Sequence, residues 1–276
     1  HRIAAVQEKL HAALIEWTDE EFSSYCARFY KPYWLALNQD NQIRNARMIA
    51  LADRLDQRLT IQIHVDEFKN ISELTIYAQD HPGLFARMTG AIAVSGASIQ
   101  DAKVFTTKDG MALDTFRIQE PDGGIFKDKH RLERLKKTIE RTLAGELLPR
   151  KELEALRRRP TKADAFTVEP RVLIDNKASN RYTVIELNGL DRPGFLYMLS
   201  QALVDLKLSI GSAHIATFGE RAVTVFFICD LFGHKVDNEN KLKKIKEKLM
   251  EALLAGITAA PKTRKKTDKK NRRVND

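Results

Sequence analysis

The chain has 276 residues, enough for two domains of ordinary size with separate cores. Its composition, 43% apolar and 30% charged, is typical of a soluble globular protein, and no apolar run approaches the roughly 20 residues of a membrane span. The net charge is +9, but the stretch from Lys262 to Asp276 carries +6 of it. A short basic run without apolar residues is typical of a solvated end. We therefore expect neither a membrane nor nucleic acid as a partner.

The chain begins with His1, and its first ten residues have the pattern of an amphipathic helix rather than of a signal peptide. We expect this chain to be the C-terminal part of a longer protein. Cys26 and Cys229 lie far apart and have no ligand-spaced partners, which favours free thiols in a reducing, cytoplasmic setting and predicts no metal site.

The first 58 residues are predicted to be mainly helical. Apolar residues at helical spacing begin at Ile3, and Thr18 with Glu21 forms a capping box that opens a second helix. Pro32 interrupts that helix, and another helix is expected from Gln42 to Leu55. The alternation of polar and apolar residues over 60–65 then predicts a strand.

One segment of the chain recurs at a fixed offset of 111 residues. The turn Asp80-His81-Pro82-Gly83-Leu84-Phe85 returns as Asp191-Arg192-Pro193-Gly194-Phe195-Leu196. Carried forward without a gap, the same offset pairs further residues: Ala91 with Ala202, Ser98 with Ser209, Thr106 with Thr217, and Phe116 with Phe227. A register held over about forty residues indicates one structural unit used twice.

Each copy gives the same predicted order of elements. The first copy has strand 74–78, the turn, helix 84–92, strands 98–106 and 111–118 joined at Asp109-Gly110, and helix 132–143. The second copy has strand 182–187, helix 195–206, strands 209–218 and 222–229, and helix 240–254. The fourth strand is assigned to Arg171–Ile174 in the first copy and to a stretch near Gly256–Ala259 in the second. The order β-α-β-β-α-β is that of a ferredoxin-like unit, so the fold class is α+β with two such units after a helical segment.

Each turn places a glycine after a proline and directly before a helix, and this arrangement has two possible roles. The unpaired N–H groups of a helix N-terminus attract an anion such as an amino-acid carboxylate, and a missing side chain allows close approach. Alternatively, Pro-Gly only shapes the passage from strand to helix, with Asp as a cap. The candidate ligand-binding residues are Asn188, Asp191, Arg192, Pro193, Gly194, Phe195 and Leu196, with Asp80, His81, Pro82, Gly83, Leu84 and Phe85 in the other copy.

On these turns the copies resemble ACT domains, small regulatory modules that bind amino acids between the first strand and the first helix. The segments 181–197 and 212–221, and the region around Tyr33-Trp34-Leu35, further resemble the C-terminal part of bacterial PII uridylyltransferase/uridylyl-removing enzymes. That resemblance implies a glutamine-sensing allosteric region. Its implied partners are L-glutamine or a similar amino acid, a PII-type signal protein and the enzyme's own catalytic domains, with ACT–ACT pairing within or between chains.

The expected domains are a helical segment at 1–58, a first ACT domain at 59–177 with a charged insertion at about 145–165, a second ACT domain at 178–260 and a basic tail at 261–276. No catalytic motif is found: the chain has no Asp-x-Asp and no histidine followed directly by aspartate. The magnesium site and the hydrolase metal of the parent family would therefore lie outside this chain, which needs no cofactor. Two alternatives stay open: an ACT pair that only mediates dimerisation, and a nucleic-acid- or ribosome-associated regulator of the stringent-response type.

Overall fold

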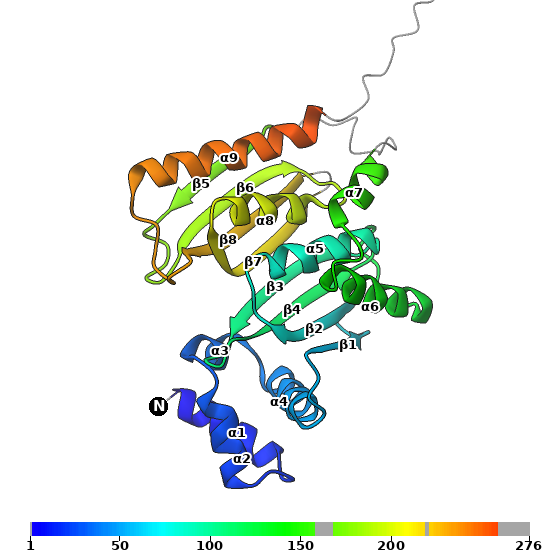
Figure 1. The fold of residues 1–276 in the computed structure, drawn as a ribbon, viewed down its shortest axis with the longest axis vertical. Helices are drawn as coiled ribbons and strands as arrows, with labels where there is room; N and C mark the ends of the chain where they lie inside the picture. Colours follow the sequence, from blue (N-terminus) through cyan, green and yellow to red (C-terminus); the bar gives the residue numbers. More distant parts are fainter. Residues whose placement is uncertain (1, 158–167, 219–220, 259–276) are drawn as a thin grey trace, which may run out of the picture.

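The computed structural model describes residues 2–157, 168–218 and 221–258 (Figure 1). The predicted basic tail and the part of the predicted charged insertion beyond residue 157 lie outside these ranges. The described chain is mixed α+β, with a helical segment followed by two ACT-like units, as the sequence predicts.

The helical segment consists of α1 (Arg2–Ala13), α2 (Asp19–Ala27), α3 (Lys31–Ala36) and α4 (Gln39–Arg54). The predicted capping box is present: the Thr18 hydroxyl accepts from the Glu21 N–H at 3.2 Å, and the Glu21 carboxylate accepts from the Thr18 N–H at 2.8 Å. Pro32 lies in the first turn of α3, where its missing N–H costs nothing, so the predicted interruption is the start of a new helix.

The two units repeat the same elements, with an additional helix α7 between them. The first unit contains β1 (Leu59–Asp66), β2 (Ile71–Gln79), α5 (Leu84–Val94), β3 (Ser98–Thr106), β4 (Met111–Gln119) and α6 (Lys129–Leu143). After α7 (Pro149–Arg157), the second unit contains β5 (Arg171–Asp175), β6 (Thr183–Leu190), α8 (Phe195–Asp205), β7 (Leu208–Phe218), β8 (Arg221–Asp230) and α9 (Glu239–Thr258).

The eight strands of the described residues form one antiparallel sheet in the order β1-β2-β4-β3-β7-β8-β6-β5. The units join where β3 pairs with β7, through Asp101 with His214, Ala102 with Ala213, and Lys103 with Ser212. The offset of 111 residues relates Ala102 to Ala213, which is also its pairing partner. The same offset relates the Asp101–His214 pair to the Lys103–Ser212 pair. The units are therefore related by a local two-fold axis through the Ala102–Ala213 pair, and the possible ACT–ACT pairing occurs within this chain.

Both assignments of a fourth strand are wrong. Arg171–Ile174 belongs to β5, which pairs with β6 of the second unit, and Gly256–Thr258 is part of α9. In each unit the edge strand is the one that comes first in the sequence: β1 pairs with β2, just as β5 pairs with β6. Both pairings join neighbours in the sequence through short connections, which cost little loop-closure entropy.

The repeat also shifts by one residue at the hairpin after β3 and β7. Ala102 is opposite Phe116, whereas Ala213 is opposite Phe226, and both phenylalanines are fully buried. The expected match of Phe116 with Phe227 is therefore wrong, because β7 reaches β8 through a hairpin one residue shorter.

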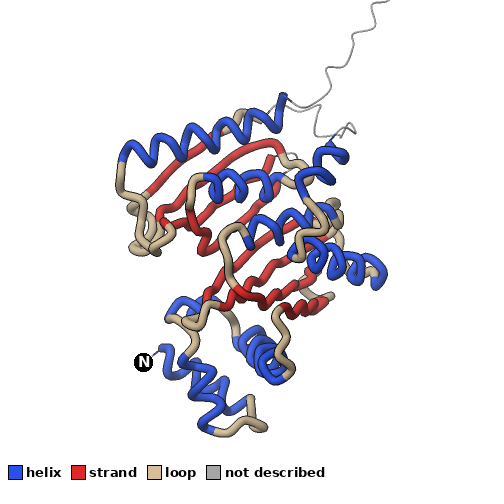
Figure 2. The backbone as a smooth tube through the Cα atoms, in the orientation of Figure 1, coloured by secondary structure: helices blue, strands red, loops and turns tan. Residues whose placement is uncertain are grey.

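The sheet has helices on both faces (Figure 2). Helices α5, α6, α8 and α9 pack on one face, where apolar side chains from both units form a single core that includes Met88, Ile139, Leu199 and Ile245. On the other face, Tyr77 and Leu113 of the first unit join a second core with residues of the helical segment. The first unit is therefore sandwiched between the helical segment and its own helices.

Candidate functional site

The two Pro-Gly turns have the same backbone geometry. Gly83 and Gly194 are the N-caps of α5 and α8, with φ of +85° and +80°. Each glycine carbonyl accepts the first helical hydrogen bond, from Arg87 at 3.0 Å and from Met198 at 2.9 Å. This left-handed conformation strains any residue with a Cβ atom, which explains glycine at both positions.

The first turn is open to solvent. Asp80, His81 and Pro82 are exposed, and one carboxylate oxygen of Asp80 accepts from the Thr106 hydroxyl at 3.0 Å. A Cβ placed on Gly83 would meet Val204 of α8 at 3.8 Å, an ordinary contact. Leu84 and Phe85 are buried in the core, so they support the turn and do not line its surface.

The second turn is covered by α7. A Cβ on Gly194 would lie 2.7 Å from Leu153 Cδ1, so this helix packs directly on the glycine. Asp191 and Arg192 are half-buried and Pro193 is exposed, while Phe195 and Leu196 are buried in the core. The two turns have the same backbone conformation, but different side chains pack against them.

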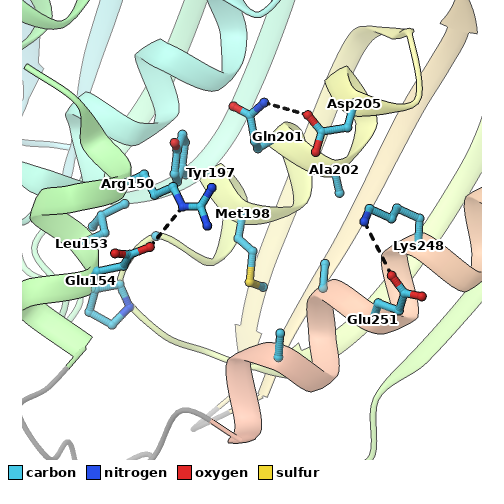
Figure 3. Close-up of a pocket in the computed structure, with 14 residues that line it drawn as sticks. Arg150, Leu153, Glu154, Tyr197, Met198, Gln201, Ala202, Asp205, Lys248 and Glu251 are labelled. Atoms are coloured by element: carbon cyan, nitrogen blue, oxygen red, sulfur yellow. Dashed lines mark hydrogen bonds and ion pairs between the residues drawn. The ribbon is translucent and has the colours of Figure 1, made fainter.

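A cavity of about 360 Å³ lies beside the second turn, between α7, α8 and α9 (Figure 3). It is large enough for an amino acid, and its walls are mainly apolar. Of the predicted residues, the cavity brings together only Pro193 and Gly194. The other lining residues are Arg150, Leu153, Glu154, Tyr197, Met198, Gln201, Ala202, Asp205, Lys248, Glu251, Ala252 and Ala255.

Charged and polar pairs surround this cavity on three helices. Arg150 Nε lies 3.0 Å from Glu154 Oε1 on α7, and Lys248 Nζ lies 3.6 Å from Glu251 Oε2 on α9 (Figure 3). On α8, the Gln201 amide donates to Asp205 at 3.1 Å. Such solvent-facing ion pairs contribute little stability, so they can exchange partners with a ligand at small cost. Both signs of charge beside an apolar wall suit a zwitterion.

The structure does not bring Asn188 to the helix N-terminus. Its side chain is buried and accepts from Arg221 Nη2 at 2.9 Å. Since Leu187 faces the helices, the alternation along β6 directs Asn188 to the opposite face of the sheet. Helices α7 and α9 supply half of the residues that line the cavity, and no local sequence signal connects these helices with the turn.

A buried carboxyl group lies near the first turn. Asp114 on β4 is 1% exposed, and its Oδ1 has no hydrogen-bond partner among the described residues. Burial raises the pKa of Asp114 well above its usual value, and the charge of Asp80 adds to the shift. The equivalent residue of the second unit is Thr224, which is also buried and whose hydroxyl has no partner within the described ranges.

The described residues contain no group of three or more His, Cys, Asp or Glu that could hold a metal ion. Cys26 and Cys229 are free, and burial raises the pKa of both thiols, to about 11 for Cys26. Both sulfurs are therefore poor nucleophiles. Across the ranges that the structure describes, no helix combines the length and apolarity needed to cross a membrane.

Comparisons with known proteins agree with this architecture. The second unit matches the model of the ACR family N-terminal ACT domain over residues 178–255, and the first matches the ACT domain model over residues 72–140. Both matches leave out the edge strands β1 and β5. A solved structure, the aspartate kinase of Synechocystis, covers 67% of this chain at 16% identity with a TM-score of 0.37, and this chain covers 28% of it.

Two curated relatives are similar over nearly the whole chain. It is 45% identical over 255 residues to the bifunctional uridylyltransferase/uridylyl-removing enzyme of Azospirillum brasilense and 43% identical over 264 residues to that of Rhodopseudomonas palustris. The alignments cover 91% and 94% of this chain, but the chain spans only 27% and 28% of those enzymes. The chain thus contains two ACT domains in tandem, and over nearly its whole length it is homologous to part of the bifunctional uridylyltransferase/uridylyl-removing enzymes.

Proposed function

We propose that this chain is the amino-acid-sensing region of a PII-protein uridylyltransferase/uridylyl-removing enzyme in nitrogen regulation, with L-glutamine as its ligand. The observation that supports it most is the cavity beside the second turn, which combines a helix N-terminus, an apolar wall and charges of both signs. The names of the relatives support the choice of enzyme. The uridylyl transfer and removal would take place in the cytoplasm, on catalytic domains outside this chain.

The ligand would lie across the cavity with its charged ends at different helices. Its carboxylate would meet the N-terminus of α8 and Arg150, where the helix dipole and the guanidinium favour an anion. Its ammonium would meet Glu154 or Glu251, and Gln201 would be available to the side-chain amide. Because α7 comes from the connector between the units, occupancy would fasten that connector onto the second unit. Allosteric couplings of this kind typically amount to about 1–3 kcal/mol.

Two variants test this site without touching the backbone of the turn. Arg150→Gln and Gln201→Leu should each weaken L-glutamine binding about tenfold in calorimetric titration, because each removes one polar contact. Arg141→Gln is the matched control, since Arg141 is an exposed arginine of α6 that pairs with Glu146 outside the cavity. Equal affinity in all three variants would contradict the placement of the ligand.

The second candidate function is an ACT pair that mediates assembly without a ligand. It is favoured by the β3–β7 junction, where the two units pair through their own strands. A chain that stays folded and changes its assembly with concentration, but ignores amino acids, would support this function instead. The alternative of a nucleic-acid-associated regulator rests on the basic tail, outside the described residues.

A further inference from the structure

A second cavity, of about 300 Å³, lies on the sheet face opposite α5 and α8, where the helical segment approaches the second unit. It forms because β3 and β7 pair over only three residues each and then separate. Residues of β3 beyond Lys103 and residues of β7 before Ser212 line the resulting gap. None of the residues of the two Pro-Gly turns contributes to it.

The lining of this cavity is aromatic and cationic. Tyr30 comes from the helical segment, where it is 50% exposed, and Tyr182 comes from the second unit. The two cations are Lys103 and Arg181, and no Asp or Glu is among the lining residues. The cavity beside the second turn, in contrast, has three carboxylates in its lining.

The cationic side chains are placed for an anion. Arg181 is exposed and lies with its guanidinium carbon 5.3 Å from the centre of the Tyr182 ring, and it has no ion pair among the described residues. Lys103 Nζ donates to the Ala36 carbonyl at 2.7 Å, which leaves two of its three donors. The third basic side chain in the lining is His214, and its Nδ1 is hydrogen-bonded to Asp101 Oδ1 at 2.5 Å.

The position of the Tyr182 ring depends on a glycine. A Cβ on Gly211 would lie 2.6 Å from Tyr182 Cε1 and 2.9 Å from its hydroxyl, so the ring packs directly on the backbone of β7. Gly211 occupies the irregular position where the pairing of β7 with β8 shifts register. Together, the bulge and the glycine hold the Tyr182 ring in place, and the Arg181 guanidinium lies over this ring.

We propose that this cavity binds a small anion that carries a planar ring, in the form of a nucleoside monophosphate. Aromatic faces stack on any base, and an arginine fork matches the geometry of a phosphate. The hydroxyls of Ser209 and Ser212 supply further donors. A bound nucleotide would bridge the helical segment and the second unit. This site is separate from the proposed glutamine site, so either can fail without the other.

The test is calorimetric titration of the whole chain with uridine 5′-monophosphate, with uridine and inorganic phosphate as the two halves of the ligand. Uridine 5′-monophosphate should bind more tightly than either half. Arg181→Gln should weaken it about 10- to 100-fold, the range for a lost charged hydrogen bond, and Tyr182→Leu should weaken it as well. Arg150→Gln, in the other cavity, should leave the affinity unchanged.

Three results would overturn the proposal. The first is the absence of saturable heat with uridine 5′-monophosphate in a sample that circular dichroism shows to be folded. The second is an affinity for inorganic phosphate equal to that for the nucleotide. The third is nucleotide binding that Arg181→Gln leaves unchanged. Arg181 is exposed, so its replacement tests binding without the risk of unfolding the chain.

Discussion

Replacing Asp114 with asparagine should stabilise the protein at neutral pH. The side chain is buried on β4, has an unpaired oxygen and lies near the charge of Asp80. Asparagine keeps the shape and removes the charge. A buried polar group without its partner costs about 1–3 kcal/mol, and more if it is charged, so we expect Asp114→Asn to raise the free energy of unfolding by about 1–3 kcal/mol at pH 7.

The gain should depend on pH in one direction. The pKa of Asp114 is raised in the folded state, so the folded protein holds this proton more tightly than the unfolded chain. The stability that Asp114 contributes to the wild type is therefore fully present below the unfolded pKa of about 3.9. This contribution is lost as the pH rises through the folded pKa. A difference of one between the folded and unfolded pKa values corresponds to about 1.4 kcal/mol. The advantage of the variant should shrink towards pH 4.

Urea unfolding at pH 7, 5.5 and 4 measures this difference, provided that the m-value is unchanged. Asp237→Asn serves as the control, because Asp237 is an exposed aspartate. Equal stability of wild type and Asp114→Asn at pH 7, or an advantage that is as large at pH 4 as at pH 7, would show that the charge of Asp114 does not destabilise the folded protein.

Two further predictions concern the turns and the junction with the helical segment. Gly194→Ala should destabilise the protein by about 2–4 kcal/mol, because the new Cβ would collide with Leu153 in addition to straining the backbone. Gly83→Ala should cost only the backbone strain, about 1–2 kcal/mol. Urea unfolding compares them, and equal costs would show that α7 does not press on the second turn. Arg28→Met should cost about 2 kcal/mol, because Arg28 ties α2 to Asp53 at 2.7 Å and to Asp109 at 2.8 Å with a side chain only 17% exposed. Thermal unfolding measures this loss, and an unchanged midpoint would mean that the junction is held by apolar contacts alone.

Local patterns predicted much of this fold. The capping box at Thr18, the hairpin at Asp109 and the glycine N-caps are short-range features, and each depends on the conformational preference of a few residues. The duplicated turn also predicted two units with the same order of elements. The Ala102–Ala213 pair then shows that the sequence offset coincides with a spatial axis.

Long-range neighbours could not be predicted in the same way. The apolar pattern of β5 shows that it is a strand, but nothing in the pattern shows whether it pairs with β2 or with β6. Phe226 and Phe227 are adjacent aromatics, and only the hairpin length decides which of them faces the core. The contact of Leu153 with Gly194 joins residues 41 positions apart, so the difference between the two turns appears only in three dimensions.

The most direct test of the central claim is calorimetric titration of this chain with L-glutamine, with L-glutamate and D-glutamine as controls. We expect saturable binding of L-glutamine alone, weakened about tenfold by Arg150→Gln and unchanged by Arg141→Gln. No binding of L-glutamine to a folded chain, or binding that Arg150→Gln leaves unchanged, would contradict a sensor site beside the second turn.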